Sequence, residues 1–172
     1  MVYSRGYHPL PKLSFLLALP VGTESLQESF DVEFYDVFSG EDLKQVLQTH
    51  MPQGIHIALV EEVRKDGKAP RLKESHYDLY LNGVEVSQQD LDSFLKSSSF
   101  PVYKSGKKGD RVVDARPLVK NMILRSNDRI DLVMSHGSGA ELRPADLIKG
   151  VFHLSAQDLA QIRILKTKQI LC

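Results

Sequence analysis

The sequence HYDLYLNG at residues 76–83 decides how the rest of the chain is divided. Apolar and polar side chains alternate over HYDLYL, which predicts a half-buried strand, and the dipeptide Asn82-Gly83 is typical of a tight turn. The preceding stretch, RKDGKAPRLKES at residues 64–75, is polar, charged and interrupted by glycine and proline. We therefore interpret residues 64–75 as a linker or long surface loop, and the strand as the start of a second unit, residues 76–172.

The second unit is predicted to run strand, helix, several strands, helix, strand. Ser87 and Asp90 form a helix N-cap signature ahead of an apolar helix face, and Pro144 occupies the first position of a later helix. The runs PVYKS and RVVDA flank GKKGD and predict a hairpin, MILRSNDRIDLVMS predicts two strands around a turn, and IRILKTKQIL predicts a closing strand. This succession is that of a βαββαβ unit, a sheet with its helices on one face.

The first unit, residues 1–63, repeats the later part of this succession. Its predicted elements are a strand at 13–21, a strand at 28–37, a helix from Ser39 to Pro52 and a strand at 55–63. The predicted fold class is therefore α+β with two ferredoxin-like (βαββαβ) units, the first lacking its opening strand and helix. Such a unit leaves one sheet edge exposed, and an exposed edge can pair with a neighbouring chain, including a second copy in a homodimer.

The composition is that of a globular chain: 172 residues, of which 42% are hydrophobic and 26% charged. The longest apolar run, residues 13–21, is far shorter than the roughly 20 residues that cross a membrane, so we expect a cytoplasmic protein without membrane contact. Cys172 is the single cysteine, which excludes a disulfide framework, a cysteine-rich zinc site and an iron–sulfur cluster held by this chain alone. The histidine spacing matches no metal motif, so neither a metal nor a cofactor is expected.

Charge is distributed unevenly although the net charge is zero. Residues 1–60 carry three Lys or Arg against seven Asp or Glu, whereas residues 97–172 carry thirteen against seven. A partner with a negative surface is therefore expected to meet the C-terminal half. The residues that would give a basic hairpin there are Lys104, Lys107, Lys108 and Arg111.

No complete catalytic set emerges from the sequence, which favours a protein that is not an enzyme. Glu24 and Glu28 form an acidic pair that is a candidate for proton transfer, although carboxylates beside a turn are usually solvated or cap a backbone group, which we favour here. Asp114 and Arg116 lie on one face of a predicted strand, either as an ion pair or with the guanidinium free for an anion. Arg143 follows the glycine-rich stretch SHGSGAEL at the start of a predicted helix, where backbone N–H groups can hold a phosphate or carboxylate. A flexible turn is the favoured explanation of that stretch, and Arg143 at the helix start is the reason to retain the anion site as the alternative.

The opening stretch YSRGYHPLPKLSF, residues 3–15, holds more chemistry than a turn requires. Glycine and prolines suffice for a turn, but Arg5, Tyr7, His8 and Lys12 surround them. Together with ALPVGTES and ESFDV, the stretch resembles the signature of the radical SAM-linked protein family, a domain of unknown function. The matching positions are Ser4, Gly6, Tyr7, Pro9, Pro11, Lys12, Leu19, Pro20, Gly22, Ser25 and Glu28, with DARP at 114–117 and LRP at 142–144 as further landmarks. The family often has histidine between its prolines, where this chain has Leu10.

The resemblance implies a link to radical SAM enzymes. Members occur as separate chains or as C-terminal domains joined to such enzymes, often encoded near genes for ribosome and RNA metabolism. They carry a strand and a helix before the point where this chain starts, so an N-terminally shortened form is expected. Radical SAM chemistry needs several thiolates to hold its cluster, and a chain with one cysteine cannot be the radical enzyme.

Our leading hypothesis is a non-catalytic accessory module that works with a radical SAM protein and helps to bind RNA in tRNA or rRNA modification. Cations beside aromatic side chains suit stacked bases and phosphates. One alternative is a small hydrolase or transferase with an anion-binding cleft between the two units, formed by His8, Glu28, Asp114 and Arg116. The other is a structural dimerisation module that uses the exposed sheet edge.

Overall fold

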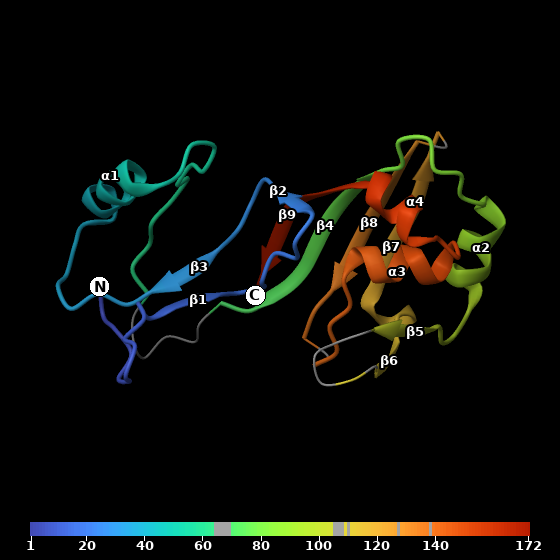
Figure 1. Cartoon of the computed structure of the whole chain (residues 1–172). Helices are drawn as coiled ribbons and strands as arrows, with labels where there is room; N and C mark the ends of the chain where they lie inside the picture. Colours follow the sequence, from blue (N-terminus) through green and yellow to red (C-terminus); the bar gives the residue numbers. More distant parts are fainter. Residues whose placement is uncertain (64–69, 105–108, 110, 127, 138) are drawn as a thin grey trace. The chain divides into compact units, whose positions relative to one another are not determined.

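The computed structural model describes residues 1–63, 70–104, 109, 111–126, 128–137 and 139–172. The chain is a mixed α/β protein, so the predicted α+β class is confirmed (Figure 1). It divides into two compact units. Unit 1 comprises Met1–Phe15 and Phe30–Pro70, and unit 2 comprises Leu16–Ser29 and Arg71–Cys172. Among the described helices, none is long and apolar enough to cross a membrane.

Unit 2 is built on a five-stranded sheet in the order β2-β9-β4-β8-β7. Its strands are β2 (Thr23–Ser25), β4 (Leu72–Tyr80), β7 (Val119–Arg125), β8 (Arg129–Ser135) and β9 (Arg163–Leu171). The pairs β9–β4, β4–β8 and β8–β7 are antiparallel, whereas β2 joins the edge of β9 in parallel. The helices are α2 (Gln88–Lys96), α3 (Pro144–Val151) and α4 (Ala156–Gln161), with a 3-10 turn η1 at Arg116–Leu118. β4, α2, β7, β8, α3 and β9 thus follow the predicted βαββαβ succession.

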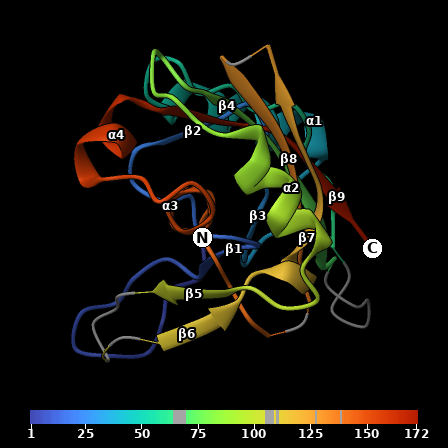
Figure 2. The ribbon, with the colours of Figure 1, turned by 90° about the vertical axis from the view of Figure 1, so that its right-hand side faces the viewer.

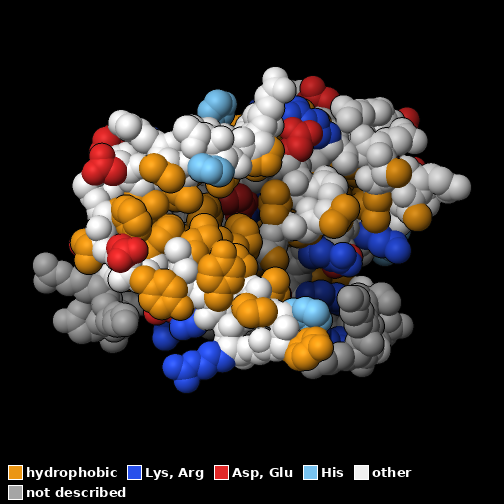
Figure 3. Space-filling view, turned by 60° about the vertical axis from the view of Figure 1, so that its left-hand side comes forward, with side chains coloured by type: hydrophobic (Ala, Val, Ile, Leu, Met, Phe, Trp, Pro, Cys, Tyr) orange, Lys and Arg blue, Asp and Glu red, His pale blue; other side chains and the backbone are white. Residues whose placement is uncertain are grey.

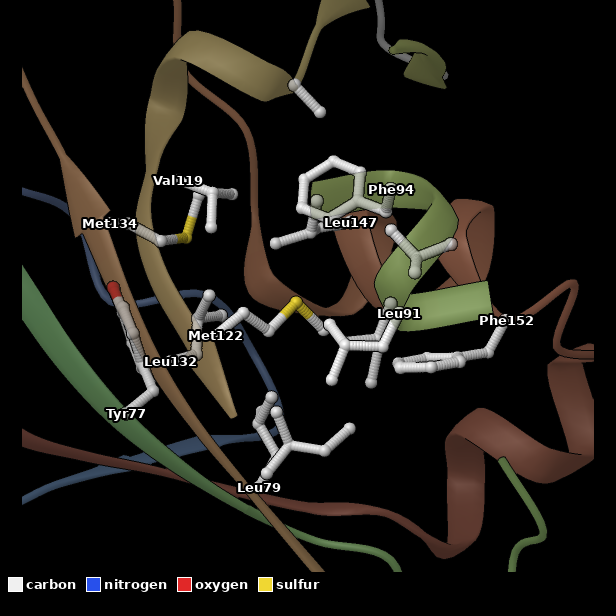
Figure 4. Close-up of a cluster of buried hydrophobic side chains, with 14 of the residues drawn as sticks. Tyr77, Leu79, Leu91, Phe94, Val119, Met122, Leu132, Met134, Leu147 and Phe152 are labelled. Carbon is white, nitrogen blue, oxygen red and sulfur yellow. The ribbon is translucent and has the colours of Figure 1, made fainter. Parts of the chain in front are cut away.

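The core of unit 2 lies between one face of this sheet and helices α2 and α3 (Figure 2). Alternation over β4 turns Tyr77 and Leu79 to this face, where they meet Met122, Leu132 and residues of both helices (Figure 4). The helix residues are Leu91 and Phe94 of α2 and Leu147 of α3. Full burial of each such side chain contributes about 1.5–3 kcal/mol, which makes this layer the main source of stability in unit 2.

The predicted hairpin between α2 and β7 is present in unit 2. It consists of β5 (Pro101–Lys104) and β6 (Arg111–Asp114), paired antiparallel. Two of the four residues predicted to make it basic, Lys107 and Lys108, lie outside the described residues. The stretch RPLVKN, which the sequence left ambiguous, divides into η1 and the start of β7.

Unit 1 contains β1 (Leu13–Phe15) and β3 (Phe30–Val32), paired antiparallel, and α1 (Gly40–His50). Helix α1 begins as predicted, because the Ser39 hydroxyl accepts a hydrogen bond from the backbone N–H of Asp42 at 3.1 Å. The strand predicted at 28–37 is reduced to the three residues of β3. The strand predicted at 13–21 ends at Phe15, and the next strand, β2, follows the Gly22 turn and belongs to unit 2.

The strand predicted at residues 55–63 is wrong: these residues form no strand. Their alternating sequence has no neighbouring strand to pair with among the described residues of unit 1. Part of their backbone bonds to a side chain of α1 instead. Gln48 Nε2 donates to the Ile55 carbonyl at 2.9 Å, and Gln48 Oε1 accepts from the Ile57 N–H at 2.8 Å. A strand needs a partner as well as a pattern.

Candidate functional site

The opening motif forms a closed loop in unit 1, residues 4–10, which we call the N-terminal loop. The Ser4 N–H donates to the Leu10 carbonyl at 2.8 Å, and the Leu10 N–H donates to the Ser4 hydroxyl at 3.0 Å. Tyr3 and Pro11 form an antiparallel bridge at its base. Ser4 therefore closes the loop with both its backbone and its side chain, which gives this serine of the motif a structural role.

The tip of the N-terminal loop presents three side chains with recognition chemistry. Tyr7 is 96% exposed, and its ring lies edge-on to His8 with the ring centres 5.1 Å apart. Arg5 is exposed and makes no hydrogen bond or ion pair with another described residue. The fourth predicted residue differs, because Lys12 Nζ lies 2.9 Å from Glu33 Oε2. Arg5, Tyr7 and His8 thus offer a guanidinium and two rings to a ligand, while Lys12 is held by an ion pair.

Unit 1 leaves most of its large hydrophobic side chains exposed. Val2 is the one hydrophobic side chain counted as buried among its described residues, and helix α1 buries none. Hydrophobic side chains adjoin one another on the surface seen in Figure 3. The exposed ones that belong to unit 1 include Leu13, Phe15, Phe30, Tyr35, Phe38, Val46, Ile55 and Leu59.

The β1–β3 ribbon contributes a regular apolar face to this surface. The register pairs Leu13 with Val32 and Phe15 with Phe30, which places all four side chains on one face. The rings of Phe15 and Phe30 lie 5.7 Å apart, and these residues remain 54% and 37% exposed. A two-stranded ribbon is marginally stable in water when nothing covers its apolar face.

Unit 2 contains a buried polar cluster that the sequence analysis missed apart from Glu28. Lys166, on β9, is completely buried, and its Nζ lies 2.6 Å from Oε1 of Glu28, which is three residues after the end of β2. The second oxygen of Glu28 accepts a long hydrogen bond of 3.4 Å from Gln169 Nε2. Lys166 pairs with Tyr77 and Gln169 pairs with Ser75. Lys166 and Gln169 are three positions apart on β9, and the register irregularity between His76 and Tyr77 allows both to meet residues on the same face of β4. The cluster therefore forms a polar end to the core.

The same cluster continues towards His136, just after β8. The Ser75 hydroxyl lies 2.9 Å from His136 Nε2. Burial lowers the pKa of His136 below its usual value, the Glu141 carboxylate opposes that shift, and the Lys166 charge adds to it. Burial raises the pKa of Tyr77, an effect that Ser75 opposes and the Glu28 charge reinforces. A neutral His136 and a protonated Tyr77 next to an ion pair make a connected polar layer.

The other predicted site residues of unit 2 make structural contacts. The Asp114 carboxylate accepts hydrogen bonds from the N–H of Phe100 at 2.8 Å and of Arg116 at 3.1 Å, and such bonds lower its pKa. The Arg116 guanidinium donates to two backbone carbonyls, of Leu95 and Val119, and lies over the Phe94 ring. No ion pair joins the side chains of Asp114 and Arg116, so each instead fixes the backbone around η1.

The structure also shows the surroundings of Arg143 and of the two described cations of the β5–β6 hairpin, Lys104 and Arg111. Arg143 pairs with Asp146 through two hydrogen bonds of 2.7 and 2.9 Å within the first turn of α3. Lys104 Nζ donates to the Glu141 carbonyl at 2.9 Å, while Arg111 is exposed. Of the residues proposed for an anion-binding cleft, His8 belongs to unit 1 and Glu28, Asp114 and Arg116 belong to unit 2. Within unit 2, Glu28 is bound to Lys166, and the other two have the partners given above.

Within the described residues, no group of three or more His, Cys, Asp or Glu side chains is placed to hold a metal ion.

Comparison with known families identifies the family of the chain. Neither the curated proteins nor the solved structures gave a match. A family model described as "Uncharacterized protein conserved in bacteria (DUF2344)" matches residues 1–144, which include the N-terminal loop, β2 and most of unit 2. The chain belongs to this bacterial family.

Proposed function

We propose that this member of the family is a non-catalytic accessory module of a radical SAM system, acting in the cytoplasm. The uncovered apolar surface of unit 1 is the observation that carries the proposal. Monomeric proteins rarely leave large contiguous apolar patches in water, and such patches typically mark protein interaction sites. The resemblance of the opening motif to the radical SAM-linked family supplies the kind of partner: the enzyme that holds the cluster this chain cannot hold.

The polar groups of unit 2 support an accessory role over catalysis. Glu28, Asp114 and Arg116 each bond to a group of the fold itself, and none is left available for proton transfer or for an anion. A hydrolase or transferase needs a base or nucleophile beside a place for the substrate. The tip of the N-terminal loop is different, because the side chains of Arg5, Tyr7 and His8 make no hydrogen bond or ion pair with the other described residues.

We assign RNA contact to the N-terminal loop. Tyr7 and His8 provide rings on which an unpaired base can stack, and Arg5 can reach a phosphate or stack on a base. The open face of the unit 2 sheet suits RNA less well, because three of its arginines are held by carboxylates. Arg129 and Arg125 both bind Asp131, and Arg163 binds Glu24 through two hydrogen bonds.

Sedimentation velocity of the purified chain with each radical SAM protein of the source bacterium tests the accessory role. We expect a complex with one of them, lost when Phe15 and Phe30 are both changed to serine and kept when the exposed Tyr103 of unit 2 is changed to serine. A small fluorescent RNA at low salt tests the loop: Arg5→Ala with Tyr7→Ala should weaken RNA binding by the complex. Absence of any complex contradicts the accessory role, and RNA binding unaffected by the loop variant contradicts the RNA assignment.

A further inference from the structure

The β5–β6 hairpin of unit 2 (Figure 2) places two cations directly opposite each other. Its register pairs Lys104 with Arg111, next to the pair of Tyr103 and Val112. Side chains at directly opposite positions of an antiparallel ladder have Cβ atoms about 4.5–5.5 Å apart, and two like charges there destabilise the pairing. The hairpin therefore carries a local repulsion that a bound anion would relieve.

No ion pair with a described carboxylate compensates these two charges. The Lys104 ammonium donates to the backbone carbonyl of Glu141 at 2.9 Å, which fixes its position without neutralising it. Arg111 is exposed and makes no hydrogen bond or ion pair with another described residue. Asp114 of the same hairpin lies three positions from Arg111 on β6 and so on the other face, where its carboxylate accepts from two backbone N–H groups. Both cations keep their charge available for a ligand.

The opposite face of the hairpin presents an exposed aromatic ring. Alternation turns Tyr103 and Val112 to this face, where they remain 79% and 58% exposed. Because the two residues are directly opposite in the ladder, the branched side chain of Val112 extends the apolar surface beside the ring. Such a ring offers a face on which an unpaired base can stack.

The base of the hairpin is held firmly by the core of unit 2. Val102 is buried, and Val113 packs against the same core. Helix α3 approaches closely here, because a Cβ at Gly150 would lie only 3.1 Å from a methyl carbon of Val102. The exposed Tyr103 and Arg111 take no part in this packing, so replacing either of them should leave the hairpin in place.

We infer that the β5–β6 hairpin is a contact for single-stranded nucleic acid, with Lys104 and Arg111 on its phosphates and Tyr103 under one of its bases. An anion alone would satisfy the cations, but the exposed ring fits a ligand that joins a flat group to each negative charge, as a nucleotide does. The cations and the ring lie on opposite faces of a two-stranded ribbon, so a strand that crosses the ribbon meets both.

The nucleic acid is RNA under the proposed function, on which this inference rests. It adds a second contact, in unit 2, to the one assigned to the N-terminal loop of unit 1. A duplex keeps its bases paired and stacked inside the helix, so it cannot place one on the Tyr103 ring. The ligand is therefore an unpaired segment.

Fluorescence anisotropy of a labelled single-stranded RNA of about ten nucleotides, titrated with the full chain at low salt, tests the contact. Tyr103→Ala should weaken binding at least about fivefold, the smallest loss expected for one stacked base, whereas Tyr103→Phe keeps the ring and should bind nearly as well. Arg111→Ala should make the plot of log affinity against log salt concentration less steep by about 0.7, the share of one phosphate contact, and Arg111→Lys should restore the slope.

Two further probes separate RNA from other anions. A duplex of the same sequence should bind equally to the unaltered chain and to Tyr103→Ala, because it has no base for the ring. A poly-glutamate peptide of the same length should bind more weakly than the RNA strand. Poly-glutamate that binds as tightly as the RNA would assign the hairpin to an acidic protein surface and overturn the inference. RNA binding that neither Tyr103→Ala nor Arg111→Ala changes would overturn it as well.

The loop variant with Arg5→Ala and Tyr7→Ala separates this inference from the proposed function. If the loop variant loses RNA affinity and the hairpin variants do not, the hairpin inference is wrong and the loop assignment stands. The reverse result supports the hairpin and contradicts the loop assignment. Absence of RNA binding by the chain at low salt overturns the hairpin inference, whereas the accessory role is tested separately by complex formation without RNA.

Discussion

The ammonium of Lys166 lies 2.6 Å from a carboxylate oxygen of Glu28, and Lys166 has no exposed surface. These residues are far apart in sequence and meet because β2 pairs in parallel with β9. Burying an ammonium is costly unless a charge compensates it. Among the described residues, Glu28 is the charged partner of this ammonium, and the ion pair holds the segment after β2 against the sheet, so this carboxylate serves the fold of unit 2.

Changing Glu28 to glutamine should destabilise unit 2 by about 2–4 kcal/mol, because it leaves the buried Lys166 ammonium without its counter-charge. Chemical denaturation followed by circular dichroism measures this free energy of unfolding. Adding Lys166→Met to Glu28→Gln should recover part of the loss, since the unpaired charge is then absent. Glu24→Gln is the control, because the Glu24–Arg163 pair is exposed and its loss should cost clearly less. Equal losses for Glu24→Gln and Glu28→Gln would contradict this account.

Stability should fall as the pH drops below about 6.5, the usual pKa of histidine. Burial lowers the pKa of His136 in the folded chain, so the unfolded chain binds this proton first and acid favours unfolding. The loss should begin as the pH falls through the ordinary value of 6.5 and end below the folded pKa. His136→Gln should remove this part of the pH dependence. Denaturation between pH 7 and pH 5 measures it, and an unchanged slope in the variant would assign the effect to other groups.

Changing Ser4 to alanine should loosen the N-terminal loop while leaving unit 2 intact. The substitution removes the hydroxyl that accepts the Leu10 N–H, a bond worth about 0.5–1.5 kcal/mol. We expect faster exchange of the Leu10 amide and weaker RNA binding, with no change in the thermal unfolding of unit 2. Ser4→Thr keeps the hydroxyl and is the matched control. Slow Leu10 exchange in the alanine variant would show that the backbone bonds close the loop without the side chain.

Replacing both Phe15 and Phe30 by serine should reduce binding of a hydrophobic dye such as ANS, which reports exposed apolar surface. Both rings lie on the exposed face of the β1–β3 ribbon and outside the buried cluster of unit 2. Tyr103→Ser, which removes an exposed ring from unit 2, should change the dye signal little. Unaltered dye fluorescence in the double variant would show that this face is not the apolar surface the dye detects.

Local sequence signals predicted the elements that depend on near neighbours. The alternation of apolar and polar residues predicted β4, and the serine caps predicted where α1 and α2 begin. The turn sequence GKKGD between two strand-like runs predicted the β5–β6 hairpin. The βαββαβ succession of unit 2 followed from the order of these elements. Within the candidate site, the sequence pointed to the N-terminal loop and to Glu28, although it did not show that Ser4 closes the loop or that Glu28 binds a buried lysine.

The rest depends on contacts between distant residues. Residues 16–29 belong to unit 2, although they lie in the first half of the sequence, because β2 pairs with β9. Nothing in the sequence near β2 specifies β9 as its partner. Lys166 had a signal that could have been used: it lies two residues from Ile164 in a predicted strand and so shares its buried face. Residues 55–63 have a strand pattern that needs a neighbour, and the pattern alone cannot show whether that neighbour is present.

Calorimetric titration of each radical SAM protein of the source bacterium into this chain tests the proposal that the apolar surface of unit 1 docks such a partner. Burial of apolar surface on binding gives a negative heat-capacity change, so the account predicts binding with such a change for the unaltered chain. The change should be smaller, and binding weaker, when Phe15 and Phe30 are both serine. Binding of equal strength and equal heat-capacity change in the double variant, or no binding to any radical SAM protein of the source bacterium, would contradict the account.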